Sequence, residues 1–375
     1  MNSDGVIEDV FWLMGELLPD DQPIGGRDTT MGLTLSVIIP VHNGGTQLVR
    51  TLEALINSTY SPDEIIVVDD GSSDDSPAIA ARFGAVVLYS GRCAGGPAHA
   101  RNIGARYAKS DILLFIDADC AVQPETVARV LRRFEGADAP TALIGTYDDS
   151  PAETNFLSQY KNLIHAYVHR SSAGDVSSFW GGCGAILRNA FISINGFDSL
   201  RFRRPSIEDI EMGYRLTDNG GRIALDPQVQ VKHLKRWTLP SLLRTDLMDR
   251  AIPWTQLLHE TKRKEQNLNL QFQQKLSVVL IYLSMICLVG SLVWSGFALI
   301  TLLLLTVVTL LNVDVYAFFA RQRGLWFALR VVPLHWLYYA YSGLGFMLGT
   351  SAYAGAQIRQ RWQSSPIRPG THFTN

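Results

Sequence analysis

Four short apolar runs alternate with amphipathic segments in the first part of the chain. The runs are rich in branched side chains and nearly free of charge, which is typical of strands buried on both faces of a sheet. The segments between them have apolar positions at helical spacing. Predicted strands are 35–39, 65–68, 86–88 and 112–116, and predicted helices are 46–57, 77–83, 98–108 and 124–134. This alternation implies an α/β fold, a mainly parallel sheet flanked by helices.

The last third of the chain has a different pattern. Residues 276–311 contain no Lys, Arg, Asp or Glu, and this length is too great for one bilayer crossing and about right for two. A turn at 294–296 would make a helical hairpin, and the uncharged stretch 331–356 predicts a third crossing. A buried helical core is the alternative. Basic residues flank the hairpin on one side, but a third crossing would export the basic tail against the positive-inside rule, so two to three crossings stay open.

The regions between and before these parts are mixed. A polar-aromatic helix is predicted at 153–169, and apolar positions at 6–18 predict an amphipathic helix that docks on the domain or lies on a membrane. Residues 239–258 mix Leu and Trp with Arg, as interfacial helices or packed surface helices do. The predicted organisation is an N-terminal helix and linker (1–32), an α/β domain (33–237), interfacial helices (238–274), two to three transmembrane helices (275–358) and a tail (359–375).

Composition narrows the function. The 375 residues include 33 Lys and Arg against 35 Asp and Glu, so no nucleic acid partner is expected. The four cysteines lie far apart and the first residues lack the basic start of a secretory signal. Reduced thiols and a cytosolic α/β domain are the simplest interpretation, which predicts a multi-pass protein of the inner (cytoplasmic) membrane.

The most informative motif is a pair of carboxylates directly after the fourth predicted strand. Asp117 and Asp119 follow the apolar run 112–116, at the end of the strand where open α/β sheets bind ligands. Hard oxygen ligands in this spacing suit Mg²⁺ or Mn²⁺ carrying a diphosphate. The motif therefore predicts nucleotide binding.

Polar residues also follow the first two predicted strands. His42 and Asn43 end the first and Asp69 and Asp70 the second, where they would form a nucleoside pocket. The alternative for the acidic stretch is a turn and a helix cap. Glycines before the helix that carries Arg101 suit a diphosphate, although Arg101 could instead pair with an acidic loop residue.

Taken in order, these motifs and three later ones resemble the family 2 glycosyltransferases of the GT-A fold. The resemblance covers about residues 35–233 and is specific through the joint order of its pieces. It rests on Ser36-Val37-Ile38-Ile39-Pro40-Val41-His42-Asn43, Glu64 to Asp75, Ala100-Arg101-Asn102-Ile103-Gly104, Asp117-Ala118-Asp119, Gly181-Gly182-Cys183-Gly184-Ala185, Asn195-Gly196-Phe197-Asp198 and Glu208 to Leu216.

The resemblance implies roles for individual residues. Asp117 and Asp119 would hold the metal ion on the donor diphosphate, with Asp119 as the more direct ligand, and Asp209 would be the general base with Glu208 as second candidate. A carboxylate opposite the leaving diphosphate suits an inverting displacement, but the same pair also suits a helix start. The residues implied in nucleotide-sugar binding are Pro40, His42, Asn43, Asp69, Asp70, Arg101, Asn102, Asp117 and Ala118.

The end of the domain offers a further metal ligand and acceptor contacts. His233 resembles a histidine that completes the metal or diphosphate site in relatives. It also opens His233-Leu234-Lys235-Arg236-Trp237, which resembles the Gln-x-x-Arg-Trp motif of processive synthases with His in place of Gln. Gly182, Arg236 and Trp237 are expected on the acceptor side, Trp237 either stacking on a sugar or simply packed.

These expectations describe a membrane-anchored, metal-dependent, inverting glycosyltransferase. It would move a sugar from a nucleotide sugar, expected to be UDP-linked, to a lipid-associated or cell-envelope glycan acceptor at the bilayer. The alternatives are a processive polysaccharide synthase and a non-catalytic nucleotide-sugar-binding membrane protein. A sugar nucleotidyltransferase would share the sheet, but Asn43-Gly44-Gly45-Thr46 stands where its Gly-x-Gly-[Ser/Thr]-Arg loop would be.

Overall fold

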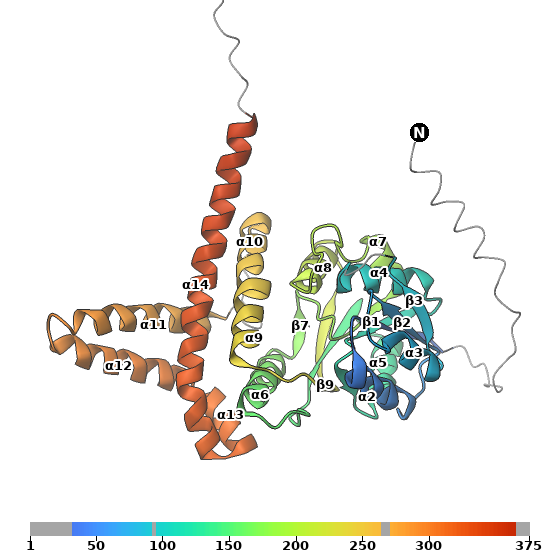
Figure 1. Ribbon diagram of the computed structural model, residues 1–375, viewed down its shortest axis with the longest axis horizontal. Coiled ribbons are helices and arrows are strands. Elements are labelled where there is room, and N and C mark those ends of the chain that lie inside the picture. The colour runs from blue at the N-terminus through green and yellow to red at the C-terminus, as the bar shows by residue number, and fades with distance from the viewer. Residues whose placement is uncertain (1–31, 92–94, 264–270, 365–375) are drawn as a thin grey trace, which may run out of the picture. The chain divides into compact units, whose positions relative to one another are not determined.

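The computed structural model describes residues 32–91, 95–263 and 271–364, with side chains to residue 360. The predicted helix at 6–18 lies outside the described residues. A nine-stranded sheet is followed by helices (Figure 1), and eight strands run in the order β3-β2-β1-β4-β8-β6-β9-β5, with β7 paired to β9. The strands are β1 Leu35–Val41, β2 Glu64–Asp69, β3 Val86–Tyr89, β4 Ile112–Ile116, β5 Cys120–Val122, β6 Ala142–Tyr147, β7 Gly174–Val176, β8 Cys183–Leu187 and β9 Ile223–His233.

One half of the sheet is parallel, as the apolar runs predict. β1 pairs in parallel with β2 and β4, and β2 with β3. All residues of β1 and β4 are buried, because helices cover the sheet and the runs carry no charge. The intervening helices are α2 Gly45–Ile56, α3 Ser76–Arg82, α4 Pro97–Tyr107 and α5 Thr126–Glu135. All eight elements predicted in this half are confirmed within one or two residues at most of their ends.

The other half of the sheet is mixed, so "mainly parallel" describes only the first half. β8 runs antiparallel to both β4 and β6, whereas β6 and β9 are parallel. β5 and β7 each run antiparallel to β9. The long β9 thereby connects the carboxylate motif after β4 to the end of the domain. The remaining domain helices are α6 Phe156–Ser171, α7 Arg188–Ser193 and α8 Glu208–Asp218.

Helices make up the rest of the described chain. The predicted hairpin is present as α11 and α12, with residues 291–295 between them. Within the described residues, α11 is long and apolar enough to cross a bilayer, and α12 with α13 passes the same test only as a pair bent by 64°. The stretch 331–356 lies in α14, which is not among these helices, so the number of crossings stays a prediction. The helices are α9 Leu239–Arg244, η1 Thr245–Ala251, α10 Ile252–Thr261, α11 Phe272–Gly290, α12 Gly296–Leu311, α13 Val313–Arg323 and α14 Leu325–Ser364.

The segment predicted as interfacial packs against protein. Leu242 of α9 and Leu257 of α10 are fully or almost fully buried, while Met248 of η1 is exposed. Asp246 of η1 forms an ion pair with Lys161 of α6 and accepts a hydrogen bond from the Tyr341 hydroxyl of α14 at 2.8 Å. These contacts join the α/β domain, η1 and α14, which favours the packed alternative for this segment.

Candidate active site

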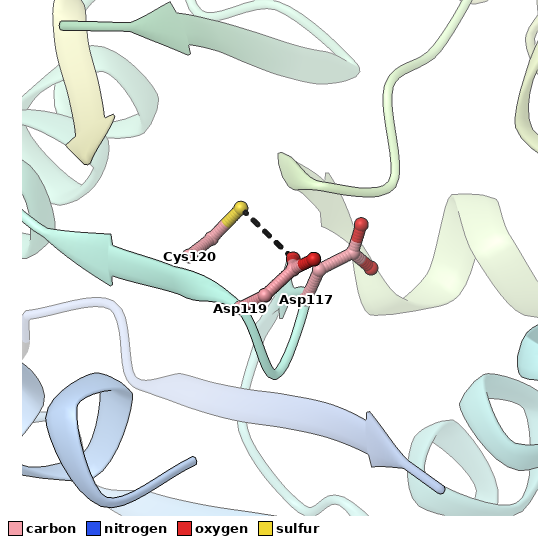
Figure 2. Close-up of side chains that lie close together, drawn as sticks. All are labelled: Asp117, Asp119 and Cys120. Carbon is pink, nitrogen blue, oxygen red and sulfur yellow. Dashed lines mark hydrogen bonds between the residues drawn. The ribbon is translucent and has the colours of Figure 1, made fainter. Parts of the chain in front are cut away.

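The Asp-x-Asp motif forms a tight turn between β4 and β5. The Cys120 amide donates to the Asp117 carbonyl at 2.9 Å, which closes the turn. Figure 2 shows the carboxylates of Asp117 and Asp119 on this turn. The Asp117 and Asp119 side chains are 37 % and 25 % exposed, so both remain accessible from the cleft described below.

Strand register brings a histidine to this turn. Cys120 of β5 lies opposite His233 of β9, and this register leaves Nε2 of His233 3.7 Å from Oδ2 of Asp119. Burial acts to raise the pKa of Asp119, but the contact with His233 and its charge outweigh burial, so the pKa is lowered. Asp119 is therefore ionised near neutral pH, as a metal ligand must be.

Cys120 has a ligand atom near the two carboxylates, within 4.8 Å of theirs. Its thiol is fully buried and donates to Oδ1 of Asp119 at 3.7 Å. Burial, together with the charge of Asp119, raises the pKa of Cys120 well above its usual value. Because only the thiolate binds metals well, the two carboxylates are the ligands of this group that suit Mn²⁺ or Mg²⁺. His233 is not part of the group and lies near Asp119, so its role as a third ligand stays a prediction.

Arg101 connects the two acidic pairs. Its guanidinium donates to Oδ1 of Asp117 at 2.6 Å and to Oε1 of Glu208 at 2.9 Å. Arg101 is 4 % exposed, and a Cβ on Gly181 would lie 2.9 Å from its Cζ atom. The structure thus shows the alternative in which Arg101 pairs with acidic residues, and Arg101 connects Asp117 to the first residue of α8.

The residues after β1 and β2 form the opposite wall. His42 Nδ1 lies 3.0 Å from the Asp70 carbonyl, and the Asn43 side-chain oxygen accepts from the Ser73 amide at 2.8 Å. The Asp70 carboxylate accepts from the amides of Gly95 and Gly96 at 2.9 and 2.7 Å. It thus fixes the glycine loop before α4 against β2.

Two residues expected at the nucleotide have other partners. Asp69 does not line the cleft, and its carboxylate accepts from the amides of Gly71 and Ser72 at 3.2 Å. Asn102 exchanges two hydrogen bonds with the backbone of Phe197, at 2.8 and 3.0 Å. Both side chains shape loops around the site.

The second acidic pair begins α8. Glu208 is 4 % exposed, and its oxygens accept from Arg101 and from the Ser206 amide. Asp209 accepts from the Gly181 amide at 3.0 Å and lines the cleft. Burial, and then the charge of Glu208, raises the pKa of Asp209 to about 6. Its other oxygen accepts from the Ile210 amide at 2.8 Å, but unlike Glu208 it is in no ion pair with Arg101. The raised pKa makes Asp209 the more basic candidate for accepting a proton.

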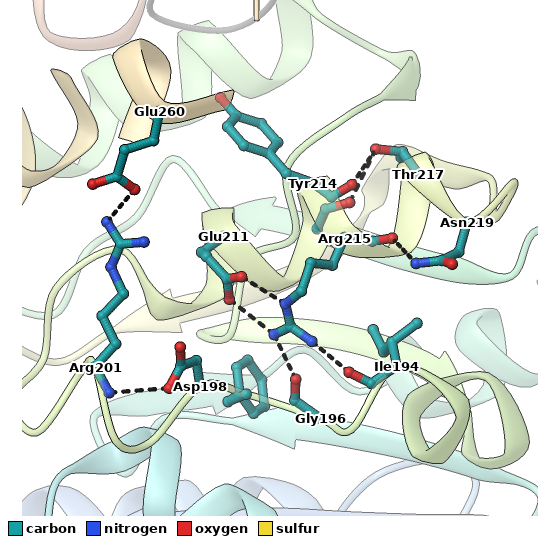
Figure 3. Close-up of polar contacts among 12 residues, drawn as sticks. Ile194, Gly196, Asp198, Arg201, Glu211, Tyr214, Arg215, Thr217, Asn219 and Glu260 are labelled. Atoms are coloured by element: carbon teal, nitrogen blue, oxygen red, sulfur yellow. Dashed lines mark hydrogen bonds and ion pairs between the residues drawn. The ribbon is translucent and has the colours of Figure 1, made fainter. Parts of the chain in front are cut away.

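Arg215 ties the Asn195–Asp198 loop to α8 (Figure 3). It forms two hydrogen bonds with Glu211, at 2.6 and 2.8 Å, and donates to the carbonyls of Ile194 and Gly196. Arg201, in the next loop, pairs with Glu260 of α10 at 2.8 Å. Arg215 thus fixes the Asn195–Asp198 loop against α8.

Of the three predicted acceptor residues, two line the cleft and one does not. Gly182 lines the cleft, and a Cβ there would lie 2.8 Å from the Trp180 ring. Trp237 reaches the cleft but is 6 % exposed, and Lys235 Nζ covers its ring at 4.5 Å. Arg236 is exposed, pairs with Glu153 at 3.2 Å and does not line the cleft. The packing supports the packed alternative for Trp237.

Sequence reasoning missed part of the wall. The Tyr147 ring stacks on His233 and lies tilted against His165, with 4.4 Å between ring centres in each pair. Lys161 and His165 also face the cleft. Their i, i+4 spacing on one helix face was an available signal. For Arg250, on η1, the sequence offered no comparable signal.

The cleft that unites these groups has a volume of about 920 Å³, enough for a nucleotide sugar. Of the predicted residues, it is lined by Pro40, His42, Asn43, Asp70, Arg101, Asp117, Ala118, Asp119, Gly182, Glu208, Asp209, His233 and Trp237.

This α/β domain brings paired carboxylates and a histidine together in one cleft. Residues 36–194 match the family model described as glycosyl transferase family 2. Through this segment, which is less than half of the chain, the protein is similar to the family 2 glycosyltransferases. The predicted fold class, an α/β sheet flanked by helices and followed by a helical region, is confirmed.

Individual relatives match over parts of their length. The chain is 31 % identical over 130 residues to glycosyltransferase GlyG of Streptococcus pneumoniae, covering 34 % of this chain and 43 % of that protein. It is 30 % identical over 160 residues to an undecaprenyl-phosphate 4-deoxy-4-formamido-L-arabinose transferase of Edwardsiella ictaluri, covering 40 % and 47 %. The chain thus spans less than half the length of these relatives. A mannosyltransferase of Pyrobaculum calidifontis, solved with GDP-Man and Mn²⁺, is similar in structure with a TM-score of 0.49 and 16 % identity, over 96 % of both chains.

Proposed function

We propose that this protein is an inverting glycosyltransferase that moves a sugar from a nucleotide sugar, UDP-linked by preference, to an acceptor at a membrane. The observation that carries the proposal is the shared cleft. Asp119 and His233 lie at one side of it and Asp209 at another, and Arg101 bridges the two acidic pairs. The cleft would thus offer metal ligands to a donor diphosphate and a general base to an acceptor hydroxyl.

The donor side is assigned to the carboxylate turn. Asp117, Asp119 and His233 would hold Mn²⁺ or Mg²⁺, which supplies positive charge to the departing diphosphate when bound. His42 and Asn43, with the glycine loop held by Asp70, would contact the nucleotide. Arg101 keeps Asp117 oriented and is already paired with carboxylates, so it acts as a positioning residue.

The acceptor side is assigned to Asp209. A raised pKa of about 6 leaves this carboxylate mostly ionised at neutral pH and still basic enough to take a proton from a hydroxyl. The hydrogen bond from the Gly181 amide fixes one of its oxygens. Glu208 is buried and fully engaged, which argues for a positioning role in place of the base.

The exposed apolar surface supports the membrane part of the proposal. In the α11–α12 hairpin, Leu292 and Val293 are 87 % and 92 % exposed and Leu299 is 72 % exposed. An apolar surface of this kind is unfavourable in water and typical of a membrane or protein contact. Both ends of the hairpin lead to basic residues that contact the α/β domain. Arg263 pairs with Asp218, and Arg323 donates to Gln159 at 2.6 Å. By the positive-inside rule, the domain would then lie on the cytosolic side of the membrane.

A donor screen tests the proposal. Full-length protein in neutral detergent would be given a panel of nucleotide sugars, with release of nucleoside diphosphate measured in Mn²⁺, Mg²⁺ or EDTA. We expect metal-dependent release with at least one donor and none for Asp119→Ala. Release of pyrophosphate would indicate a nucleotidyltransferase, and binding without turnover a sensor. Product length on an extended acceptor separates a single transfer from processive synthesis.

A further inference from the structure

A second cavity adjoins the cleft beside Asp209. Its volume is about 240 Å³, and residues of α6, η1, α11 and α14 line it. None of Asp117, Asp119 and His233 lines it, so it lies beyond the metal-binding side of the site. The side chains shared by the two spaces are Lys161, His165, Trp180, Asp209 and Arg250.

Arg250 stands at the junction of the two spaces and lines both of them. Among the described residues, no hydrogen bond or ion pair is found for its guanidinium, although the side chain is half-buried. The neighbouring cation, Lys161, is neutralised by its ion pair with Asp246. The carboxylates of Asp209 and Asp246 are close enough to interact with its charge but form no ion pair with it. The donors of this half-buried guanidinium are therefore available to the oxygens of an anionic ligand.

Other polar atoms of the same wall are also unsatisfied. His165 Nδ1, Gln274 Oε1 and His335 Nδ1 are buried without a hydrogen-bond partner in the described part of the chain, and all three residues line the second cavity. They come from α6, α11 and α14. Buried polar atoms are nearly always paired in folded proteins, so this wall is built for a polar ligand or for water.

We propose that the second cavity is the acceptor subsite and that Arg250 binds a phosphate group carried by the acceptor, close to the hydroxyl presented to Asp209. This inference rests on the proposed function and adds the chemical class of the acceptor. An arginine fork matches the oxygens of a phosphate, and His165 and Gln274 supply further polar contacts. The donor diphosphate is assigned elsewhere, beside Asp119.

The phosphate could belong to a lipid or to a water-soluble phosphorylated sugar. Helices α11 and α14 line the cavity, and both carry exposed apolar side chains such as Ile286 and Phe346, so a lipid phosphate could approach from their side. A soluble phosphate would enter through the cleft. The two sources share the contact with Arg250 and differ in the need for an alkyl chain.

Binding of three probes tests the inference. Full-length protein in maltoside micelles would be titrated with dodecyl phosphate, dodecanol and methyl phosphate, following thermal stability. Affinity for the nucleoside diphosphate chosen by the donor screen would be measured separately with Mn²⁺. The variants are Arg250→Gln, Arg250→Lys and, as a matched loss of charge on the exposed end of α4, Arg106→Gln.

We expect Arg250→Gln to weaken dodecyl phosphate binding about tenfold or more and to leave nucleotide affinity within about twofold of wild type. Arg250→Lys should be intermediate and Arg106→Gln unchanged. Comparable binding of methyl phosphate would identify a soluble source, and a requirement for the dodecyl chain a lipid source.

Two results would overturn the inference. One is equal binding of dodecyl phosphate and dodecanol by the wild type, because the phosphate would then contribute nothing to binding. This comparison needs only the wild type, so it tests the inference even if Arg250→Gln does not fold. The other is an equal loss of nucleotide affinity in Arg250→Gln, which would assign the residue to the donor. Failure of the proposed function differs from both, because no nucleotide sugar would then be bound or turned over by the wild type.

Discussion

The guanidinium of Arg101 lies 2.6 Å from Oδ1 of Asp117 and orients that carboxylate toward the cleft. The same side chain reaches Glu208, so one buried cation fixes both acidic pairs. Positions that support metal ligands matter for metal affinity almost as much as the ligands do. Arg101 is therefore expected to act on metal binding without contacting the metal.

Arg101→Lys should weaken Mn²⁺ binding and turnover by about 10- to 100-fold, because a lysine cannot bridge two carboxylates as an arginine fork does. Titration calorimetry with Mn²⁺ and the rate of nucleoside diphosphate release would measure it. Arg215→Lys is the matched control, since Arg215 is also bidentate but supports a loop. Equal metal affinity in wild type and Arg101→Lys would contradict the positioning role.

Variants of His233 and Cys120 test which of the two residues is a ligand of the metal ion. His233→Gln and Asp119→Asn should each reduce Mn²⁺ affinity, because both side chains face the cleft. Cys120→Ser should leave it nearly unchanged, since burial keeps the thiol protonated. A manganese titration followed by electron paramagnetic resonance would compare the three. A large loss in Cys120→Ser alone would assign the thiol to the metal.

The pKa of Asp209 predicts the acid side of the rate profile. Burial, and then the charge of Glu208, raises that pKa to about 6, and the base must be ionised to accept a proton. The value of kcat/KM should therefore rise as pH increases through about 6 and level off above it. Asp209→Asn should lose about 10²- to 10⁴-fold and the pH step together, while retaining nucleotide affinity. Transfer by Asp209→Asn at the wild-type rate would show that another group, or an acceptor already ionised, takes the role.

The same raised pKa makes Asp209 a cost to stability. Its folded-state pKa lies above the ordinary value of 3.8, so folding disfavours the ionised form, and the penalty grows as pH rises from about 4 to 6 and stays above that. Asp209→Asn should thus be more stable than wild type at pH 8, by at most about 3 kcal/mol, and about equally stable at pH 4. Melting temperatures at both pH values would measure it. A lower stability of the variant at pH 8 would show that the Gly181 hydrogen bond outweighs burial.

The sequence predicted the parallel half of the fold because each strand there is a short, uncharged run buried on both faces. β1 and β4 are recognisable without their neighbours. The antiparallel half was not recognised, because β8 overlaps a glycine cluster and β9 contains Asp226, Pro227 and several polar residues. Its strands are defined by pairing, which a local pattern does not show.

The site was predictable to the same extent. Asp117, Asp119 and Asp70 follow strand ends, so topology alone brings them to one edge of the sheet. Arg101 could be placed near the phosphates or near a carboxylate, and only the packed structure decides between them. Arg250 lies on η1, more than 40 residues after the start of α8 in the sequence. No rule of sequence spacing predicts that it lines the same cleft as the residues at the start of α8.

The contact of Asp246 with Lys161 and Tyr341 offers a test of how the helices support the cleft. The Lys161–Asp246 pair is buried, so Asp246→Asn would leave the lysine charge uncompensated, at a cost of about 3 to 5 kcal/mol. Tyr341→Phe removes one hydrogen bond and keeps the pair, at a cost of about 1 kcal/mol. Melting temperatures and affinity for dodecyl phosphate would be compared in full-length protein. We expect Asp246→Asn to lower both and Tyr341→Phe to lower the melting temperature slightly with dodecyl phosphate affinity unchanged. If Asp246→Asn were as stable as wild type, the pair would not hold η1, and with it Arg250, against α6.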